Sequence, residues 1–237
     1  MPFLFSVVAI SLVGGLVWSW PRPITQDYSV PKTKITIVKG DLLAETTHLV
    51  IGTNDTFDSE TPNIISLNSL QGQALQVLYG GDLKELDAQL ATALAGKPTV
   101  GNIAKVGKQT RYGVGTVATV KHAARLIFFL AYSEMDAYNT AHSTPDKVWK
   151  SLLLLWDEVS KKSNGGTVSI PVIGGGQARL SSILPAQDAI RFTLLSFMFA
   201  SRGEKVCDEL RIVVRPEDYK KLDRLELQSF LSSLRSS

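Results

Sequence analysis

Hydrophobic and polar positions follow two alternating patterns along the chain. Short runs rich in β-branched, aromatic or leucine residues predict strands. These runs cover residues 34–38, 49–52, 115–120, 125–133, 167–173 and 210–214. Longer stretches with apolar residues three and four positions apart predict amphipathic helices. These stretches cover residues 69–79, 83–94, 144–161, 185–201 and 217–234. Strands that alternate with helices predict an α/β fold, with a largely parallel sheet and helices on both faces.

The N-terminal segment differs from the rest of the chain because residues 3–20 carry no charged side chain. A helix of that length would be about 27 Å long, just short of a hydrocarbon core. Trp18 and Trp20 stand at its end, as interfacial aromatic residues do, and Pro21 stops the helix. We therefore predict a transmembrane segment at 1–20, a linker at 21–33 and one domain at 34–237. A cleaved signal peptide is the alternative, although no basic residue precedes the apolar run.

Composition and motifs exclude several classes of function. The net charge is +3 and no dense cluster of Lys and Arg occurs, so no nucleic-acid partner is expected. The single cysteine, Cys207, excludes an intramolecular disulfide, and the three histidines show no metal-ligand spacing. Neither a Walker motif nor GxGxxG is present. We therefore expect no metal, and we assign no catalytic histidine.

Two loops after predicted strands carry polar residues that suit ligand binding, because open α/β sheets bind ligands at the carboxyl ends of their strands. Asp41 follows the strand that ends at Val38. Its carboxylate either caps a helix or accepts hydrogen bonds from an exocyclic amine or an amide. Asn54 follows the next strand. Its amide either donates to and accepts from sugar hydroxyls or belongs to an ordinary turn.

A third loop, after the strand at 167–173, is rich in glycine. Glycines let the backbone approach a ligand and turn N–H groups towards an anion such as phosphate, although a flexible turn is the alternative. The loop comprises Gly174, Gly175, Gly176, Gln177, Ala178 and Arg179. Arg179 would add positive charge. Asp136, with Glu134 and Asn139, follows a further strand, where it either touches a group attached to the ligand or belongs to a solvated loop.

Taken together and in this order, the three loops resemble the macro-domain family over about residues 34–215. The resemblance rests on Gly40-Asp41-Leu42-Leu43, Val50-Ile51-Gly52-Thr53-Asn54 and the glycine-rich loop. It implies a three-layer α/β/α sandwich with a mixed, largely parallel sheet that binds ADP-ribose. It also implies that Asp41 contacts adenine, that Asn54 contacts the distal ribose, and that residues 174–177 wrap the diphosphate.

A closer resemblance is to the macro-domain effectors of Thoeris anti-phage defence. It rests on residues 49–58, 69–73 and 173–179. The resemblance implies a TIR-domain partner enzyme that makes an ADP-ribose-derived signal from NAD, a histidine-linked ADP-ribose in the membrane-tethered branch. It further implies a bacterial cell-membrane location with one or more spans, a cytoplasmic macro domain, a homo-oligomer on activation and abortive infection through membrane damage.

The sequence departs from the macro domains that hydrolyse ADP-ribosyl bonds. Ile51 stands where those enzymes carry the first asparagine of the second motif. Ser66-Leu67-Asn68-Ser69 follows, in place of a run of three glycines. We therefore expect a sensor that binds its ligand without turnover and needs no cofactor besides that ligand. A membrane-anchored ADP-ribosyl hydrolase is the alternative.

Overall fold

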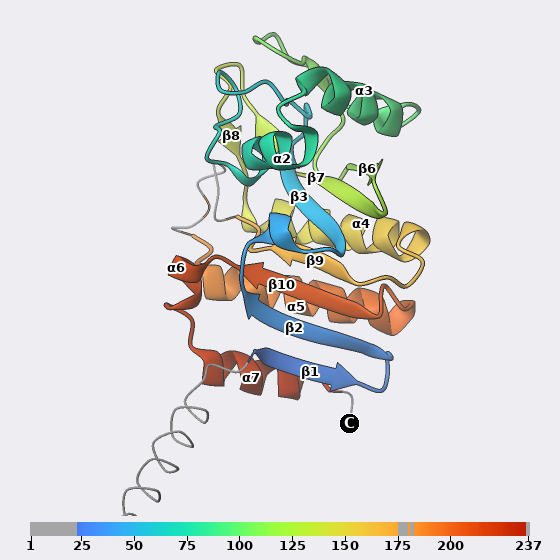
Figure 1. Cartoon of the computed structure of the whole chain (residues 1–237), viewed down its shortest axis with the longest axis vertical. Coiled ribbons are helices and arrows are strands. Elements are labelled where there is room, and N and C mark those ends of the chain that lie inside the picture. The colour runs from blue at the N-terminus through green and yellow to red at the C-terminus, as the bar shows by residue number, and fades with distance from the viewer. Residues whose placement is uncertain (1–22, 175–179, 181–182, 236–237) are drawn as a thin grey trace, which may run out of the picture.

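The computed structural model describes residues 23–174, 180 and 183–235, and a mixed sheet forms the centre of this part of the chain (Figure 1). Along the sheet the strands are β1 (Ile24–Tyr28), β2 (Thr33–Lys39), β10 (Glu209–Val214), β9 (Val168–Pro171), β3 (His48–Asn54), β7 (Arg125–Met135) and β6 (Val117–His122). The short β8 (Ala141–His142) pairs with the end of β7. The pairs from β2 to β7 are parallel, and the outer strands β1 and β6 are antiparallel to their neighbours.

Helices cover both faces of this sheet (Figure 1). One face packs against α2 (Leu70–Tyr79) and α3 (Leu83–Leu94), and the other packs against α4 (Pro145–Lys162), α5 (Ala186–Gly203) and α7 (Arg224–Ser233). The short helices η1 (Leu42–Ala44) and α6 (Pro216–Tyr219) follow β2 and β10, and a small hairpin of β4 (Gly101–Asn102) and β5 (Thr110–Arg111) follows α3. The predicted α/β fold with a mixed, largely parallel sheet is confirmed.

The central strands supply two separate hydrophobic cores. Leu49 and Ile51 of β3 pack with the residues of α2 and α3, whereas Val50 between them packs with those of α4 and α5. In β7, Phe129 likewise packs on the side of α2 and α3, and Phe128 packs on the side of α4 and α5. Successive side chains of a strand point to opposite faces, so an apolar run without alternation marks a strand that is buried on both sides.

Two segments differ from the sequence-based expectation. Residues 24–28, within the predicted linker, form β1, because Ile24 and Tyr28 alternate with exposed positions and are buried in the core beside α7. The single helix predicted at 217–234 is two helices, α6 and α7. The second helix starts anew at Asp223, whose carboxylate accepts a hydrogen bond from the Glu226 N–H.

The membrane prediction requires a correction. The segment predicted to span, residues 1–20, lies outside the described residues. Among the described residues, no helix combines the length and the apolar character needed to cross a membrane. The two longest described helices, α4 and α5, have 18 residues each and carry charges at both ends. The fold as described therefore contains no transmembrane element, and the described structure gives no support for the predicted location in the cell membrane.

Candidate functional site

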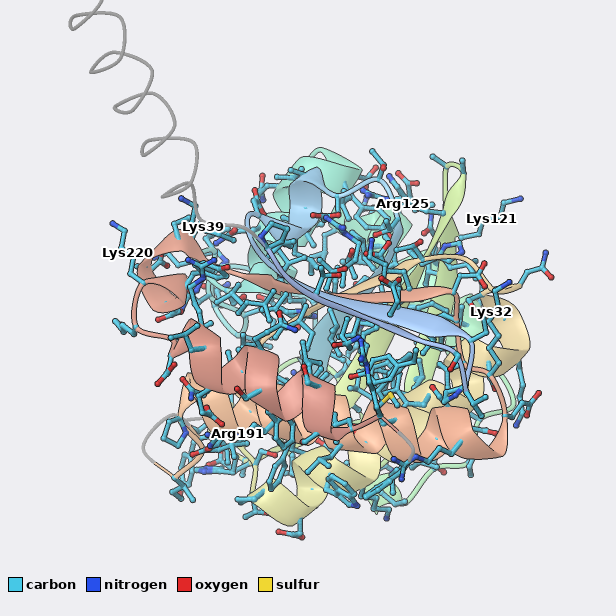
Figure 2. All side chains as sticks on the ribbon, turned by 90° about the horizontal axis from the view of Figure 1, so that it is seen from below. Lys32, Lys39, Lys121, Arg125, Arg191 and Lys220 are labelled. Carbon is cyan, nitrogen blue, oxygen red and sulfur yellow. The ribbon has the colours of Figure 1, made fainter. Side chains whose placement is uncertain are left out.

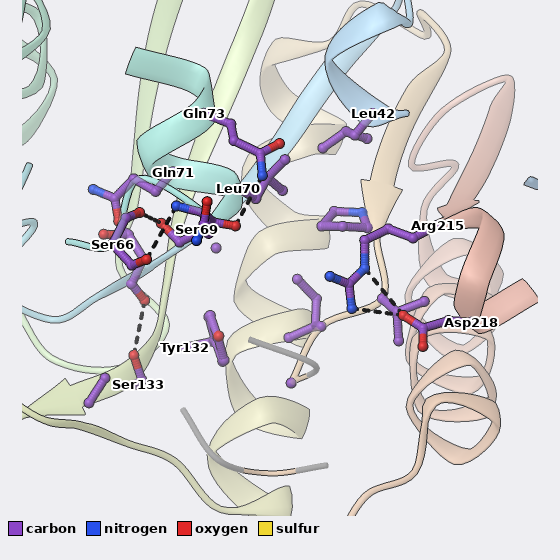
Figure 3. Close-up of a pocket in the computed structure, with 18 of the residues that line it drawn as sticks. Leu42, Ser66, Ser69, Leu70, Gln71, Gln73, Tyr132, Ser133, Arg215 and Asp218 are labelled. Atoms are coloured by element: carbon purple, nitrogen blue, oxygen red, sulfur yellow. Dashed lines mark hydrogen bonds and ion pairs between the residues drawn. The ribbon is translucent and has the colours of Figure 1, made fainter. Parts of the chain in front are cut away.

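The carboxyl ends of the five parallel strands open onto one cavity of about 860 Å³, a volume that suits a nucleotide-sized ligand. Its walls come from the ends of β2, β10, β9, β3 and β7, from the start of α2 and from the residues before α5. Figure 3 shows Ser69, Leu70, Tyr132 and Ser133 on one side of this space, with Arg215 and Asp218 on the other.

The structure brings together three of the residues that the sequence singled out. Asp41, Asn54 and Gly174 all line this cavity, although they are far apart along the chain. The sheet order fixes their sequence across it, because β9 lies between β10 and β3. Asp41 therefore lies at the β2 side, Gly174 in the middle and Asn54 at the β3 side. The predicted contacts of Gly175, Gly176, Gln177 and Arg179 fall on residues outside the described ranges.

Asn54 is nearly inaccessible, with 3% of its surface exposed, and its side-chain oxygen is fully engaged. Asn54 Oδ1 accepts hydrogen bonds from the Thr56 N–H at 3.0 Å, the Thr56 hydroxyl at 2.8 Å and the Asp58 N–H at 3.3 Å. These donors fix which side-chain atom is the oxygen. Among the described residues, the Nδ2 group has no hydrogen-bond partner. The amide therefore offers the cavity a donor, and its acceptor is already in use.

Asp41 is exposed and performs the capping role that the sequence left open. Its Oδ1 accepts a hydrogen bond from the Leu43 N–H at 3.0 Å, at the start of η1. The other carboxylate oxygen has no partner among the described residues, so the capping role and a contact with a ligand are compatible. This end of the cavity also holds charged side chains of both signs, namely Arg215, Glu217, Asp218 and Lys221. Figure 2 shows Lys39 and Lys220 extending outwards from the ribbon.

Asp136 does not line the cavity. Its carboxylate accepts hydrogen bonds from the backbone N–H groups of Tyr138 and Thr140, both at 2.8 Å, and it contacts His142 Nε2 at 2.9 Å. The hydrogen bond from Thr140, followed by the one with His142, lowers the pKa of Asp136. The side chain thus closes the turn between β7 and β8, while Asn139 from the same turn reaches the cavity.

Sequence analysis missed a set of buried charges directly behind Asn54. Asp55 is fully buried; it accepts hydrogen bonds from the Met135 N–H at 2.8 Å and from Arg111 Nε at 2.6 Å. Asp58 is 1% exposed and pairs with Lys105 Nζ at 2.6 Å. A short acidic segment immediately after a buried strand was the available signal. Its partners come from the β4–β5 hairpin and could not be identified from spacing.

The wall beside Asn54 is held rigidly by close packing around Gly72. A Cβ atom at Gly72 would lie 2.3 Å from the Ser66 carbonyl oxygen, so the helix start and the preceding loop touch through backbone. Ser69 caps α2 by accepting from the Gly72 N–H at 3.1 Å and donates to the Ser66 oxygen at 2.6 Å. Gln71 Nε2 donates to the Asp58 carbonyl at 2.5 Å. This wall is therefore tied to the same segment that fixes Asn54.

Further polar groups line the β7 side of the cavity. The ring of Tyr132 lies against Gly52, where an added Cβ would come within 2.6 Å of it. Burial raises the pKa of Tyr132 to about 12, so its hydroxyl stays protonated at neutral pH. Thr53 Oγ1 and Asn139 Oδ1 are buried without a hydrogen-bond partner in the described structure. Because unpaired buried polar atoms are unfavourable, these groups suit contacts with a polar ligand.

Known proteins share this architecture. The model for the Thoeris protein ThsA, macro domain, matches residues 35–215. A mutant of the Oceanobacillus iheyensis macrodomain is similar with a TM-score of 0.60 and 16% identity, covering 91% of this chain and 97% of that one. The same macrodomain with ADP gives a TM-score of 0.59 and 16% identity, covering 90% and 99%. At this identity the structural likeness concerns the fold alone.

No curated protein matches the chain. The match to the ThsA family model nevertheless spans more than half of the 237 residues, and it includes the ends of all five strands that form the cavity. The chain therefore belongs to the ThsA macro-domain family.

Proposed function

We propose that this domain is a sensor that binds an ADP-ribose derivative in the cavity at the carboxyl ends of its strands. The observation that carries the proposal is the order of groups across the sheet. They are a carboxylate oxygen of Asp41 with no partner in the described part of the chain, a glycine in the loop after β9, and the amide donor of Asn54. A nucleotide with two ribose groups presents an amine-bearing base, a diphosphate and ribose hydroxyls in the same order. The ADP named for the Oceanobacillus iheyensis macrodomain structure supports a ligand of this class.

For each group of the proposed ligand, the cavity offers a side chain or a backbone segment that can bind it. Asp41 accepts a hydrogen bond from the exocyclic amine of adenine. The backbone around Gly174, which has a φ of 100°, reaches the diphosphate closely because glycine has no side chain in the way. Asn54 Nδ2 donates to a hydroxyl oxygen of the distal ribose. The Tyr132 hydroxyl and Asn139 Oδ1 lie on the β7 side, where they meet the group that the distal ribose carries.

Binding without turnover is part of the proposal. Among the described lining residues there is no histidine, and the carboxylates of Asp41, Glu217 and Asp218 belong to the β2 and β10 side of the sheet. The two carboxylates nearest to Asn54 in sequence, Asp55 and Asp58, are buried in ion pairs. A general base that could activate water must lie within hydrogen-bonding reach of it, and these carboxylates are already engaged. The arrangement therefore favours a sensor over an ADP-ribosyl hydrolase.

Membership of the ThsA family extends the proposal to the biological role. We propose that a TIR-domain enzyme converts NAD into the signal, a histidine-linked ADP-ribose, during infection by phage. Binding of the signal shifts the chain towards an active homo-oligomer. The ligand drives that shift only to the extent that it binds the active state more tightly than the resting one.

The test compares ADP-ribose, its histidine conjugate and ADP on the purified chain. Titration calorimetry gives the three Kd values, thermal melting gives the stabilisation, and chromatography of the mixture detects any turnover. We expect tight binding of the two ADP-ribose compounds, a higher Tm and unchanged ligand. Asn54→Ala and Gly175→Glu should abolish binding while the far-ultraviolet circular dichroism spectrum stays the same.

Two results would contradict the proposal. If ADP-ribose is released catalytically from its conjugate, the chain is a hydrolase. If none of the compounds changes the melting temperature, the cavity does not bind this class of nucleotide.

A further inference from the structure

A buried ion pair lies directly behind the amide of Asn54. Lys105 Nζ is 2.6 Å from Asp58 Oδ2, and both side chains are inaccessible, at 0% and 1% exposure. Removing two charges from water costs free energy that their mutual attraction often does not recover. A buried ion pair is therefore weak evidence for stability. Lys105 is also absent from the lining of the cavity and touches no proposed ligand group. Neither stability nor direct contact with the ligand therefore explains why this ion pair is buried behind Asn54.

A continuous chain of hydrogen bonds joins the ion pair to the cavity. The Thr56 hydroxyl lies 2.5 Å from Asp58 Oδ2 and 2.8 Å from Asn54 Oδ1, and its single proton is shared between these two acceptors. The Asp58 N–H donates to the same Asn54 oxygen at 3.3 Å. Asp58 thus holds the Asn54 oxygen through its own N–H, and its carboxylate orients the Thr56 hydroxyl that lies against the same oxygen. A shift of the Asp58 carboxylate would reach the Asn54 amide directly.

The β4–β5 hairpin is built around the Asp58 carboxylate. The Lys108 N–H donates to Asp58 Oδ1 at 2.8 Å. A Cβ at Gly107 would lie 2.6 Å from Asp58 Oδ1, so only glycine allows the backbone to pass there. Lys105 Nζ also donates to the Val106 carbonyl at 3.0 Å, which fixes the ammonium within the hairpin itself. Both carboxylate oxygens of Asp58 are therefore held from a segment about fifty residues further along the chain.

We propose that the Lys105–Asp58 pair is a positioning device for Asn54, which sets the preference of the cavity for ligands that carry a second ribose. The proposal rests on the proposed function, in which Asn54 Nδ2 donates to that ribose. Lys105 fixes the Asp58 carboxylate, and with it the Asp58 N–H and the Thr56 hydroxyl that hold Asn54 Oδ1. The Nδ2 group is thereby aimed before the ligand arrives. Preorganisation of this kind improves binding because less freedom is lost on association.

The test uses the selectivity ratio, the Kd for ADP divided by the Kd for ADP-ribose, because ADP lacks the second ribose. Thr56→Val removes the connecting hydroxyl and leaves the ion pair in place. Lys105→Met removes the ammonium and keeps the length of the side chain. We expect each variant to lower the ratio about tenfold, the value of one well-placed hydrogen bond, with the Kd for ADP nearly unchanged.

Lys97→Met is the matched control. Lys97 Nζ pairs with Glu158 at 3.5 Å, at 31% and 14% exposure, and makes no hydrogen bond to the described segment 54–59. This variant should keep the wild-type ratio. If Lys105→Met and Thr56→Val weaken both ligands equally or leave the ratio unchanged, the pair is only structural and the proposal is overturned. Should Lys105→Met fail to fold, Thr56→Val decides the outcome alone.

A ligand-free measurement separates this proposal from the proposed function. The Nδ2 protons of Asn54 give a pair of resonances in a nitrogen–proton correlation spectrum, assigned by their loss in Asn54→Asp. Thr56→Val and Lys105→Met should shift or broaden this pair, whereas Lys97→Met should not. If the resonances respond but wild-type protein binds no ADP-ribose, the positioning device stands and the proposed ligand is wrong. Unchanged resonances in both variants overturn the positioning role.

Discussion

The two ends of the cavity differ in how deeply their polar groups are buried and in how many hydrogen bonds hold them. At the β3 end, Asn54 is 3% exposed, and its oxygen accepts hydrogen bonds from two backbone N–H groups and shares the Thr56 hydroxyl proton with Asp58. At the β2 end, Asp41 is exposed and accepts one hydrogen bond, while the Arg215 side chain is 66% exposed. A buried, preoriented donor acts in a medium of low dielectric constant and loses little freedom on binding. An exposed charge is screened by water and salt. We therefore expect selectivity to arise at the β3 end.

The largest effect should follow from Asn54→Asp. An aspartate keeps an oxygen for the Thr56 and Asp58 N–H groups but replaces the donor with a charged acceptor that repels the ribose oxygen. We expect the binding of ADP-ribose, measured by calorimetry, to weaken by about a hundredfold or more, the effect of an unpaired charge in a buried site. Asn68→Asp makes the same change at an exposed position of the lining and serves as the control. Equal losses in the two variants would show that burial of the Asn54 amide gives no advantage over an exposed amide.

Gly72→Ala should have the next largest effect, through the wall of the buried end. The added Cβ would meet the Ser66 carbonyl at 2.3 Å, and backbone must move to accommodate it. We expect Tm to fall by about 5 °C and ADP-ribose to bind about tenfold more weakly. Gly203→Ala at the end of α5 is the control, because nothing lies within 4 Å of its Cβ position. A melting curve like that of wild-type protein would show that this wall is compliant.

Asp41→Asn should have a moderate effect that depends on the base. Asparagine keeps the oxygen that caps η1 and removes the negative charge at the exposed end. We expect about fivefold weaker binding of ADP-ribose, since a hydrogen bond to a charged acceptor is stronger than one to a neutral acceptor. Ribose 5-phosphate, which lacks adenine, should bind wild-type and variant protein alike. A similar loss for both ligands would mean that Asp41 does not contact the base.

Arg215→Ala should have a still smaller effect. Its guanidinium is already paired with Asp218 at 2.8 Å and is largely in water. We expect about a twofold loss of affinity in low salt that disappears near 0.5 M salt, because exposed charges are screened over about the Debye length. A salt-independent loss above tenfold would place Arg215 among the buried determinants and remove the difference between the ends.

The smallest effect concerns the turn that holds Asn139. The pKa of Asp136 is lowered in the folded protein, first by the hydrogen bond from Thr140 and then by that with His142. A lowered pKa contributes stability above the ordinary pKa of aspartate, and this stability is lost as the pH falls through the folded value. Asp136→Asn should therefore lower Tm slightly at pH 7 and leave it unchanged near pH 2. A loss of the same size at both values would exclude this linkage.

Local sequence was sufficient to predict the strands and helices that bury one or both of their faces. Apolar runs such as 49–52 and 125–133 identified the central strands because both sides of each strand contact hydrophobic core. The edge strand β1 escaped notice because it lies between prolines and alternates over only five residues. The break between α6 and α7 was missed because the apolar spacing continues across it. Asp223, which caps the start of α7, was the sequence signal for this break.

The sequence by itself determined that Asp41, Asn54 and Gly174 lie at the carboxyl ends of strands, because the pattern of apolar residues shows approximately where each strand ends. Their order across one cavity also required the pairing of β10, β9 and β3, which no local pattern encodes. Only the tertiary structure decided which way the Asn54 amide faces. Its oxygen is held through Asp58 by Lys105, a residue distant in sequence, and a buried hydrogen-bond network takes its direction from whichever partners the folded chain brings within reach.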